Sequence, residues 1–513
     1  MRRIDTSESL PLLGTAATRA LERQLANSCP RNEPMSRAGK SIAQLALALT
    51  PHARCIWVAC GSGNNGGDGL IAATHLQGHA LKHGTGLRVA VSLCGEPGQR
   101  SPEATRALGL ATSAGIDIRD APPPSFDLAI DALLGLGASR APTDRMARQL
   151  VHMHSGTNPV LSVDLPSGLL ADTGQYLGPA PLRGRGVRHT LAFLGLQPGL
   201  FMGQGRDMAG EIWLDDLGAG PFTGPNPAAF LSASTALIRP RTHASHKGEQ
   251  GDVVVIGGQD IEHSGAGMTG AAVLAARAAL YSGAGRVYLG LLTNDGGATR
   301  WDPICPELML RRVDMLLGDH NLMARAGVVC GCGGGSEVKK WLPPLLSTCH
   351  SLVLDADALN AIAGDLGLRT LTRQRAQQGW TTVITPHPLE AARLLHSNTP
   401  SVMADRLSAS IALADDLGAI CVLKGSGTVV AAPGRVPIIN ASGNAALATA
   451  GTGDVLAGML GTALAGLDSG QDNAIQAVAN AVQHHGAAAD TWNSSQQGEL
   501  SASRLAHNLR HLR

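Results

Sequence analysis

Short apolar runs alternate with helix-length segments along most of this 513-residue chain. We expect strands at residues 55–59, 87–93, 128–131, 160–163 and 190–193 in the first half, and at 252–256, 286–291, 328–330, 352–355 and 382–385 in the second. The runs are continuously apolar, which is typical of parallel strands covered by helices on both faces. The pattern therefore predicts an α/β protein with two tandem doubly wound domains.

The alternation stops between about residues 217 and 245, where Pro, Gly and Ser dominate. We place the domain linker there, with a first domain at residues 1–225 and a second at 235–513. After the break we also expect a helix at 271–281, a strand pair joined by a Gly-rich turn across 421–432, and a closing helix from Val455. The two halves share no obvious residue-level repeat, so we expect two unlike domains.

Composition excludes several classes of protein. The chain has 41 Lys+Arg against 40 Asp+Glu and only 3% aromatic residues, which argues against a nucleic-acid partner. Its hydrophobic content of 44% and charged content of 16% argue against disorder. The nine cysteines form no C-x-x-C motif, so we expect buried thiols in a reducing compartment. With no signal peptide and no apolar run of membrane-spanning length, we expect a cytoplasmic protein without a membrane partner.

Three Gly-flanked loops follow expected strands in the first half. GSGNNGGDG at 61–69 contains a G-x-G-x-x-G pattern, but Asp68 would oppose a dinucleotide pyrophosphate at this helix end. Asp131 ends the next strand in IDALLGLG, and Asp164 and Ser167 follow in SVDLPSG. One such Asp is more often a cap or turn former. Because ligands bind at the carboxyl ends of strands in these sheets, three such loops predict a binding site.

These three motifs, with MSRAG at 35–39, resemble the N-terminal domain of the bifunctional NAD(P)H-hydrate repair enzymes over about residues 10–220. The resemblance implies an epimerase that interconverts the R and S forms of hydrated NADH and NADPH, in which Asp164 could shuttle the proton. The residues implied to bind that substrate are Asn64, Asn65, Gly66, Gly67, Asp68, Gly135, Leu136, Gly137, Ala138, Ser139, Arg140, Ala141 and Asp164. The residues implied to hold K⁺ are Asn65, Asp131 and Ser167. One carboxylate with neutral amide and hydroxyl oxygens suits a hard monovalent cation better than it suits zinc, which prefers nitrogen or sulfur ligands.

The second half has four loops at expected strand ends: HKG at 246–248, TPHPLE at 385–390, KGSGT at 424–428 and GTGD at 451–454. The glycines of GTGD expose backbone N–H groups at a helix N-terminus, where they can stabilise a transferring phosphoryl group. Asp454 can then accept a hydroxyl proton, although a plain N-terminal helix acid is the alternative. Lys424 could face nucleotide phosphates or lie in solvent, and His387 could equally be structural.

These loops, with MTGAAVLAARAAL and LDADALN, resemble the ADP- or ATP-dependent NAD(P)H-hydrate dehydratase domain over about residues 240–490, whose fold is ribokinase-like. Ala450 departs from the family, which usually has Gly there. The resemblance implies that ADP with Mg²⁺ phosphorylates the substrate hydroxyl after Asp454 deprotonates it, that phosphate leaves, and that AMP remains. Lys424, Gly425, Ser426, Gly427, Thr428 and Gly453 are implied to contact the adenine nucleotide, and Ala271, Gly333, His387 and Asp454 the hydrated cofactor. The partners are then NADHX, NADPHX and ADP, and we expect a homo-oligomer.

The alternative is a ribokinase-like small-molecule kinase with a non-catalytic N-terminal binding module. It would explain GTGD but not the fused first domain. The presence of Asn65, Asp131, Asp164 and Ser167 argues against a silent module.

Overall fold

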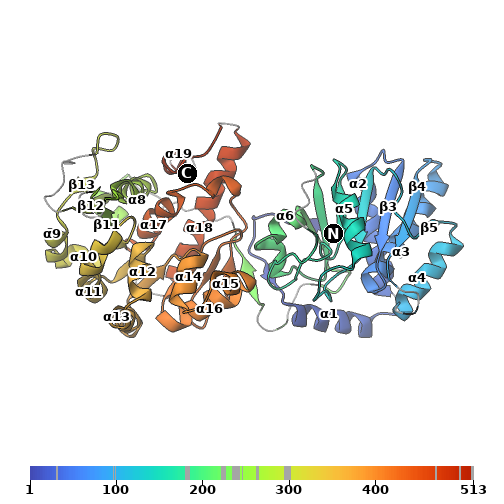
Figure 1. The fold of residues 1–513 in the computed structure, drawn as a ribbon, viewed down its shortest axis with the longest axis horizontal. Helices are drawn as coiled ribbons and strands as arrows, with labels where there is room; N and C mark the ends of the chain where they lie inside the picture. Colours follow the sequence, from blue (N-terminus) through green and yellow to red (C-terminus); the bar gives the residue numbers. More distant parts are fainter. Residues whose placement is uncertain are drawn as a thin grey trace. The chain divides into compact units, whose positions relative to one another are not determined.

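The computed structural model describes residues 1–513 except 31–32, 96–97, 99, 180–184, 221–223, 225–226, 234–242, 245, 262–264, 294–301, 468–470, 496–497 and 510–513. The chain forms two compact units (Figure 1). The first contains Met1–Asp5 and Pro11–Ala229, and the second contains Thr6–Leu10 and Phe230–Arg513. Within the second unit, Leu231 N–H donates a backbone hydrogen bond of 2.8 Å to the Leu10 carbonyl.

The first unit is built on an eight-stranded sheet in the order β1-β9-β8-β7-β6-β3-β4-β5. Its strands are β1 (Arg2–Arg3), β3 (Cys55–Cys60), β4 (Arg88–Leu93), β5 (Asp117–Arg119), β6 (Leu128–Ala132), β7 (Val160–Val163), β8 (Arg188–Phe193) and β9 (Glu211–Asp215), with β2 (Pro11–Leu12) outside this sheet. All neighbouring pairs are parallel except β1 with β9. The carboxyl ends of β3, β6 and β7 therefore meet at one edge.

The helices of the first unit are α1 (Thr15–Ser28), α2 (Glu33–Leu49), α3 (Asn64–His83), α4 (Pro102–Ser113), α5 (Asp144–His154) and α6 (Gly205–Ala209). Strand β3 is buried along its whole length because both of its faces are covered. Ile56 and Val58 belong to the core cluster that includes α2 and α3, whereas Trp57 belongs to the cluster that includes Met146 and Leu150 of α5. This two-sided burial explains the continuously apolar sequence of the strand.

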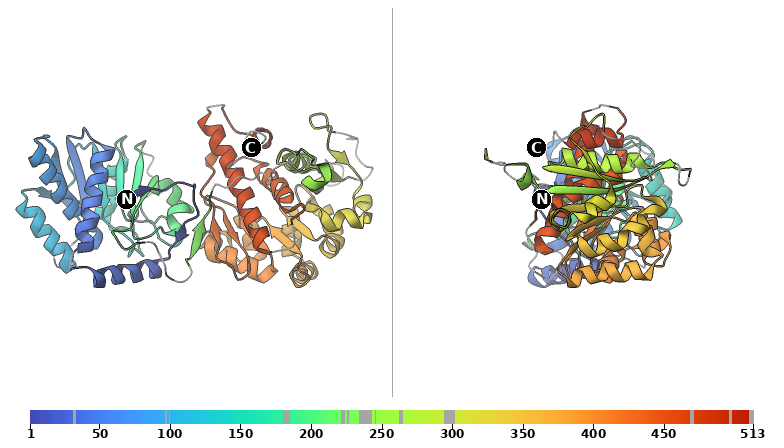
Figure 2. Two further views of the ribbon diagram at one scale, coloured as in Figure 1. Left: turned by 180° about the vertical axis from the view of Figure 1, so that it is seen from behind. Right: turned by 90° about the vertical axis from the view of Figure 1, so that its left-hand side faces the viewer.

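The sheet of the second unit runs in the order β13-β12-β11-β14-β15-β16-β17-β18-β19-β10. Its strands are β10 (Ala229–Leu231), β11 (Asp252–Gln259), β12 (Arg286–Leu292), β13 (Met309–Leu310), β14 (Gly327–Cys330), β15 (Ser351–Leu354), β16 (Thr381–Ile384), β17 (Ile420–Leu423), β18 (Val429–Ala431) and β19 (Ile438–Ile439). The neighbouring strands of the run β12-β11-β14-β15-β16-β17 pair in parallel, and β18 is antiparallel to both of its neighbours. The light green to orange strands can be followed in Figure 2.

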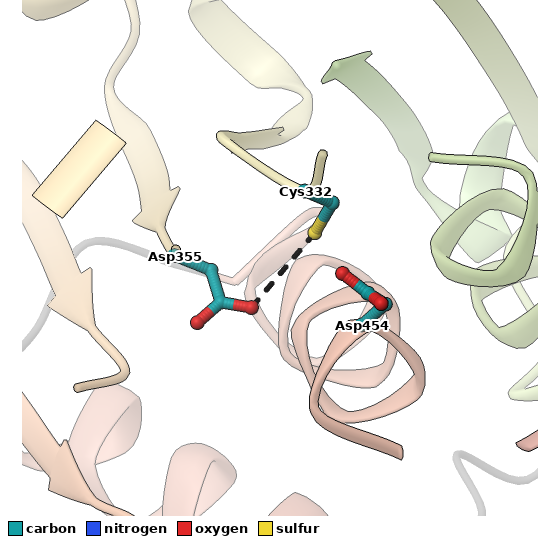
Figure 3. Close-up of side chains that lie close together, drawn as sticks. All are labelled: Cys332, Asp355 and Asp454. Atoms are coloured by element: carbon teal, nitrogen blue, oxygen red, sulfur yellow. Dashed lines mark hydrogen bonds between the residues drawn. The ribbon is translucent and has the colours of Figure 1, made fainter. Parts of the chain in front are cut away.

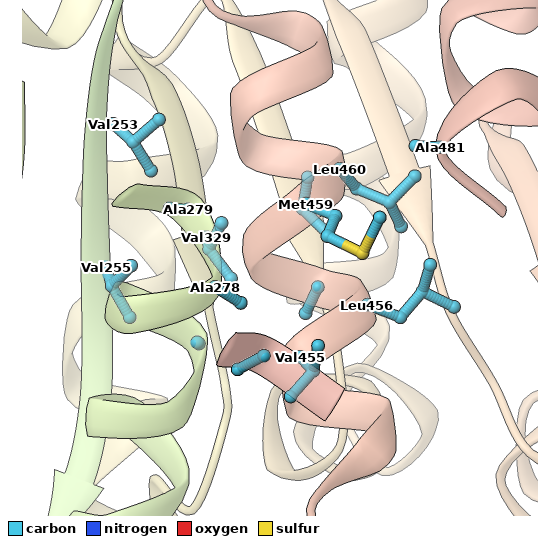
Figure 4. Close-up of a cluster of buried hydrophobic side chains, with 14 of the residues drawn as sticks. Val253, Val255, Ala278, Ala279, Val329, Val455, Leu456, Met459, Leu460 and Ala481 are labelled. Carbon is cyan, nitrogen blue, oxygen red and sulfur yellow. The ribbon is translucent and has the colours of Figure 1, made fainter. Parts of the chain in front are cut away.

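The described helices of the second unit are α8 (Thr269–Tyr281), α9 (Val313–Gly318), α10 (His320–Arg325), α11 (Val338–Thr348), α12 (Asp357–Ala363), α13 (Leu366–Gln377), α14 (Pro388–Leu394), α15 (Thr399–Ala404), α16 (Arg406–Leu417), α17 (Thr452–Leu464), α18 (Gln471–Ser494) and α19 (Ala502–Asn508). Helices α8 and α17 pack over Val253 and Val255 of β11 (Figure 4). They approach so closely that a Cβ at Gly458 would lie 2.0 Å from the Ala275 carbonyl oxygen. The small residues of both helices are therefore required by their packing.

The predicted fold class, two tandem α/β units on mainly parallel sheets, is confirmed. The expected strands all form, with ends that differ by up to three residues. Strand β10 lies within the stretch in which we place the linker, and its three residues make a pattern too short to recognise. One prediction needs correction. Helix α17 is not the closing helix, since α18 and α19 follow it. Among the described residues, no helix is long and apolar enough to span a bilayer.

Candidate active sites

A cavity of about 1290 Å³ lies in the first unit. The loops after β3, β6 and β7 contribute to its wall, as the sequence predicts. The predicted substrate-binding residues that line it are Asn64, Asn65, Asp68, Gly135, Leu136, Gly137, Ala138, Ser139, Arg140, Ala141 and Asp164. Three separate sequence motifs thus meet in one hollow large enough for a dinucleotide.

Gly66 and Gly67 are the two predicted binding residues that do not line this cavity. Both are buried in the first turn of α3. A Cβ at Gly66 would lie 2.0 Å from the Gly61 carbonyl oxygen, and one at Gly67 would lie 2.5 Å from Cε of Met35. These glycines therefore allow the loop and helix α2 to pack against α3, and their contribution to the site is to shape it.

Asp164 follows β7 in a left-handed backbone conformation, with φ of 66°. The backbone N–H of Leu136 donates to its Oδ2 over 3.2 Å, and a Cβ at Gly135 would lie 3.3 Å from the same oxygen. Burial and the negative charge of Glu22 raise the pKa of Asp164 to about 6, against the opposing effect of backbone hydrogen bonds. A carboxyl group with this pKa can take up and release a proton near neutral pH.

Asp131 and Ser167 are in direct contact in the buried floor beneath these loops. Asp131 accepts hydrogen bonds from Oγ of Ser167 over 2.6 Å, from N–H of Ser167 over 2.9 Å and from N–H of Leu133 over 3.3 Å. Burial nevertheless raises the pKa of Asp131. Asn65 lines the cavity, and a Cβ at Gly135 would lie 3.3 Å from its Oδ1. One desolvated carboxylate with neutral hydroxyl and amide oxygens is a kind of donor set that fits a monovalent cation.

Helix α1 adds charged residues to this cavity that the sequence analysis did not select. Arg19, Glu22 and Arg23 line it. Glu22 acts on both buried carboxyl groups of the cavity, because its charge raises the pKa of Asp68 as well as that of Asp164. No motif marks this helix, and only its position in the folded unit brings it to the site.

In the second unit, Asp454 lies in the first turn of α17, as predicted. It faces Cys332 and Asp355, which follow β14 and β15 (Figure 3). Asp355 is a residue that the sequence analysis did not select. It accepts a hydrogen bond from Oγ1 of Thr385 over 2.7 Å and pairs with Nζ of Lys424 over 2.8 Å. Burial and the negative charge of Asp355 raise the pKa of Asp454 to about 6.

Lys424 connects this acidic group with the predicted nucleotide loop. Its Nζ lies 3.4 Å from the position of a Cβ at Gly453, in the first turn of α17. Despite burial, the carboxylates of Asp355 and Glu390 raise its pKa, so the ammonium charge is retained. The alternative of a solvated hairpin lysine is therefore wrong, because the side chain is only 20% exposed and ion-paired.

The Gly-rich loop at 424–428 joins β17 to β18. Gly425 and Gly427 have positive φ angles of 145° and 66°, which residues with a side chain rarely adopt. Arg406, at the start of α16, donates to the carbonyls of Ser426 and Leu423 over 2.6 and 3.0 Å. Arg406 is 2% exposed, and burial lowers its pKa to about 10. Arg406 thus fixes the loop through its backbone carbonyls. The sequence analysis missed this role because Arg406 is 18 positions from Lys424.

Three further predicted residues have different local roles. His387 caps α14, since its Nδ1 accepts from the N–H groups of Leu389 and Glu390 over 3.1 and 3.4 Å. Its structural role is thus present in the fold, while Nε2 lies 3.2 Å from Oε1 of Glu390. Ala271 and Gly333 are neighbours, because a Cβ at Gly333 would lie 3.0 Å from that of Ala271.

Cys332, Asp355 and Asp454 also have the spacing of metal ligands, since one potential donor atom from each lies within 4.8 Å of the others. The thiol is fully buried, and burial with the two carboxylates raises its pKa well above the usual value. A protonated thiol is a poor ligand. The two carboxylates are therefore the donors in this group that suit a hard divalent cation.

Family models match both units. One described as NAD(P)H-hydrate dehydratase matches residues 253–510, and one described as YjeF-related protein N-terminus matches residues 32–199. The bifunctional NAD(P)H-hydrate repair enzyme of Escherichia coli K12 is 37% identical over 469 residues, which cover 89% of this chain and 84% of that one. The chain belongs to the bifunctional NAD(P)H-hydrate repair enzyme family.

Another member of this repair enzyme family, from Coxiella burnetii, is 33% identical and covers 86% of this chain and 88% of its own. Solved structures similar to the second unit include an ADP/ATP-dependent NAD(P)H-hydrate dehydratase from Bacillus subtilis co-crystallised with ATP and Mg²⁺. It is 28% identical, covers 54% of this chain and 93% of its own, and has a TM-score of 0.43. A ribokinase-like superfamily protein from Enterococcus faecalis is 24% identical, covers 53% of this chain and 89% of its own, and has a TM-score of 0.43. The relatives carry the repair enzyme name across both units, which favours that function over a kinase with a silent module.

Proposed function

We propose that this chain repairs hydrated NADH and NADPH. The first unit interconverts the R and S epimers, and the second dehydrates the S epimer with ADP to give NAD(P)H, AMP and phosphate. The observation that carries the proposal is the charged group at the N-terminus of α17, where Lys424 pairs with Asp355 and its charge acts on Asp454, in a chain that also has the Asp164 cavity. A kinase would need the first group but not the second.

In the second unit, Asp454 accepts the proton of the substrate C6 hydroxyl as its oxygen attacks the terminal phosphorus of ADP. The phosphorus–oxygen bond to AMP breaks, and the substrate becomes a phosphate ester. The ring nitrogen lone pair then expels phosphate from C6, and loss of a ring proton restores the dihydropyridine. Phosphorylation is useful because hydroxide is a poor leaving group.

The Gly-rich loop and the first turn of α17 would hold the nucleotide in this step, through Lys424, Gly425, Ser426, Gly427, Thr428 and Gly453. The ammonium of Lys424 and the exposed N–H groups of α17 stabilise charge on the transferred phosphoryl group. Ala271, Gly333 and His387 would contact the substrate. Mg²⁺ bound with ADP would neutralise phosphate charge, and Asp355 is the carboxylate of this group that would fit it while Asp454 stays free to accept the proton.

In the first unit, Asp164 would exchange a proton with the C6 hydroxyl or ring of the substrate. Asn64, Asp68 and the loop at 135–141 would hold the hydrated nucleotide beside it. K⁺ fits the oxygens of Asn65, Asp131 and Ser167, where it would offset the desolvated charge of Asp131. Its role is then to fix the loops that carry Asn65 and Asp164.

The test is to incubate purified protein with an epimer mixture of hydrated NADH, ADP and Mg²⁺. We expect reduced nicotinamide absorbance to rise as AMP and phosphate form in equal amounts. A flat trace with a stable phosphate ester would instead indicate the kinase, and a flat trace without any ester, with folded protein, would exclude both the dehydratase and the kinase.

The potassium site has its own test in epimerisation without ADP. Asp131→Asn keeps the size of the side chain but removes the charge, so K⁺ stimulation of wild type over Na⁺ should be lost in the variant. Equal responses of both proteins to the two salts would show that the ion site is wrong.

A further inference from the structure

Helix α1 is weakly integrated into the first unit. Only Thr18 and Leu25 of its 14 residues are buried. A helix usually buries a stripe of apolar residues, and that packing supplies most of its stability. The residues of α1 that line the cavity include Arg19, Glu22 and Arg23. They are spaced at i, i+3 and i+4 and therefore share one face of the helix.

The two arginines of α1 make no hydrogen bond or salt bridge with any residue that the structure describes. The same holds for Arg140, which lines the cavity from the loop after β6. One guanidinium nitrogen of Arg19 lies 3.7 Å from the position of a Cβ at Gly137 in that loop. Three guanidinium groups, each with five N–H donors, thus border one hollow without a protein acceptor. Planar donors of this kind are suited to phosphate oxygens.

The cavity wall carries both groups suited to proton transfer and groups suited to anions. The loop at 135–141 connects them: Gly135 lies beside Asn65 and Asp164, and Gly137 lies beside Arg19. The acidic groups that line the cavity are Glu22, Asp68, Glu103 and Asp164. Burial, followed by the negative charges of Asp164 and Glu22, raises the pKa of Asp68 well above its usual value. On α1 itself, Arg19 and Arg23 outnumber Glu22, whose charge both arginines stabilise.

We propose that Arg19 and Arg23 of α1 form the subsite that binds a phosphate group of the hydrated dinucleotide. This inference rests on the epimerase function proposed above. The substrate carries its charge on a pyrophosphate, and in the NADPH form also on a 2′-phosphate, both far from the reacting C6. An arginine subsite at the α1 side of the cavity would hold that charge while the ring lies beside Asp164. Helix α1, which lies outside every recognised motif, would then form part of the wall of the site.

The experiment measures epimerisation by the full-length chain without ADP, so that the second unit consumes no product. Arg19→Gln and Arg23→Gln are compared with Arg106→Gln, which removes the same charge from an exposed position of α4 that does not line the cavity. Initial rates are measured by chromatography over a range of substrate concentrations, for hydrated NADH and hydrated NADPH separately. Inorganic pyrophosphate is titrated as an inhibitor.

We expect each α1 variant to raise KM about tenfold, the effect of losing one charge-assisted hydrogen bond, while kcat stays within about twofold of Arg106→Gln. The inhibition constant of pyrophosphate should rise in parallel. A rise in KM for both substrates assigns the subsite to the dinucleotide pyrophosphate, and a rise for hydrated NADPH alone assigns it to the 2′-phosphate. Arg23→Lys should restore part of the loss.

KM values equal to those of Arg106→Gln for both substrates would overturn the subsite, as would a fall in kcat with KM unchanged. If the wild-type chain epimerises neither substrate, the proposed function itself fails, and the subsite with it. If the wild-type chain epimerises the substrates and the α1 variants do so with the same KM as Arg106→Gln, only the subsite fails and the proposed function stands.

Discussion

Asp164 combines two unfavourable features at one residue. It is a non-glycine residue with φ of 66°, and its carboxyl group is desolvated. A backbone strain of this kind costs about 1–3 kcal/mol for most residues, although Asp tolerates the left-handed region better than bulky residues do. The conformation persists because N–H of Asp164 donates to the Leu191 carbonyl over 2.8 Å and N–H of Leu136 donates to its carboxyl. The result is a carboxyl group held rigidly against the cavity.

The pH dependence of epimerisation should report the charge of Glu22. Glu22→Gln removes a negative charge that raises the pKa of Asp164, so that pKa should fall. Since a proton acceptor works in its ionised form, the acid limb of the kcat/KM profile should move to lower pH than in wild type, where we expect it near pH 6. Glu103→Gln is the matched control, because Glu103 also lines the cavity but is not a cause of the Asp164 shift. Identical profiles for all three proteins would contradict the coupling.

Asp454→Asn should separate the two activities. The amide keeps the size of the side chain but cannot accept the hydroxyl proton, so dehydration should fall by at least about 10²-fold. Epimerisation should be unchanged, because Asp454 belongs to the other unit. In wild type, dehydration should decrease as pH falls through about 6, where Asp454 becomes protonated. Coupled assays of both reactions check this, and near-normal dehydration would refute the role of Asp454.

At the scale of elements, the junction between β3 and α3 is fixed by close backbone packing. Gly63 and Gly66 are three positions apart and have opposite surroundings. A Cβ at Gly66 would lie 2.0 Å from the Gly61 carbonyl oxygen, whereas one at Gly63 would meet nothing within 4 Å. The glycines of this motif are therefore not equivalent.

We expect Gly66→Ala to destabilise the protein by about 1–3 kcal/mol, because the backbone must shift to relieve the contact. It should also weaken epimerisation, since Asn64 and Asn65 belong to the same turn. Gly63→Ala is the matched substitution and should change the free energy of unfolding by less than about 0.5 kcal/mol. Chemical denaturation of the two variants gives the comparison, and equal stabilities would show that the close approach of Gly66 to Gly61 does not limit the fold.

At the scale of the whole molecule, one chain carries two sites that act on the same substrate. Hydration of NAD(P)H yields both C6 epimers, yet a phosphorylating site built around one hydroxyl position can present only one of them to Asp454. A displacement of about 1 Å at the reacting atoms can cost 10²-fold in rate. The first unit would then convert the unused epimer into the usable one.

Asp164→Ala should consequently stall on an epimer mixture supplied with ADP and Mg²⁺. We expect a fast phase that consumes the S epimer, followed by only the slow spontaneous epimerisation, whereas wild type runs to completion. Adding the Asp454→Asn variant, whose first unit is intact, should release the stalled fraction. Consumption of the mixture by Asp164→Ala at the wild-type rate and extent would contradict this division of labour.

The sequence by itself was sufficient for the properties that local patterns encode. Buried parallel strands must be apolar on both faces, so runs such as 160–163 could be recognised without the fold. Motifs that bend the backbone or begin a helix, such as GTGD, occupy consecutive residues. They can therefore be recognised in the sequence, and Asp454 was found at its place in α17. Family resemblance extended these motifs to an activity, which the curated relatives support over most of the chain.

The tertiary structure decided which isolated residues complete each site. Asp355 is 69 positions from Lys424, and Glu22 is 142 positions from Asp164, so no local spacing relates the partners. It also decided that Gly66 packs against backbone while Asn65 lines the cavity, although the two are adjacent in one motif. The physical reason is that burial, electrostatic coupling and packing depend on distances in space, which the chain sets only when the sheet and its helices have assembled.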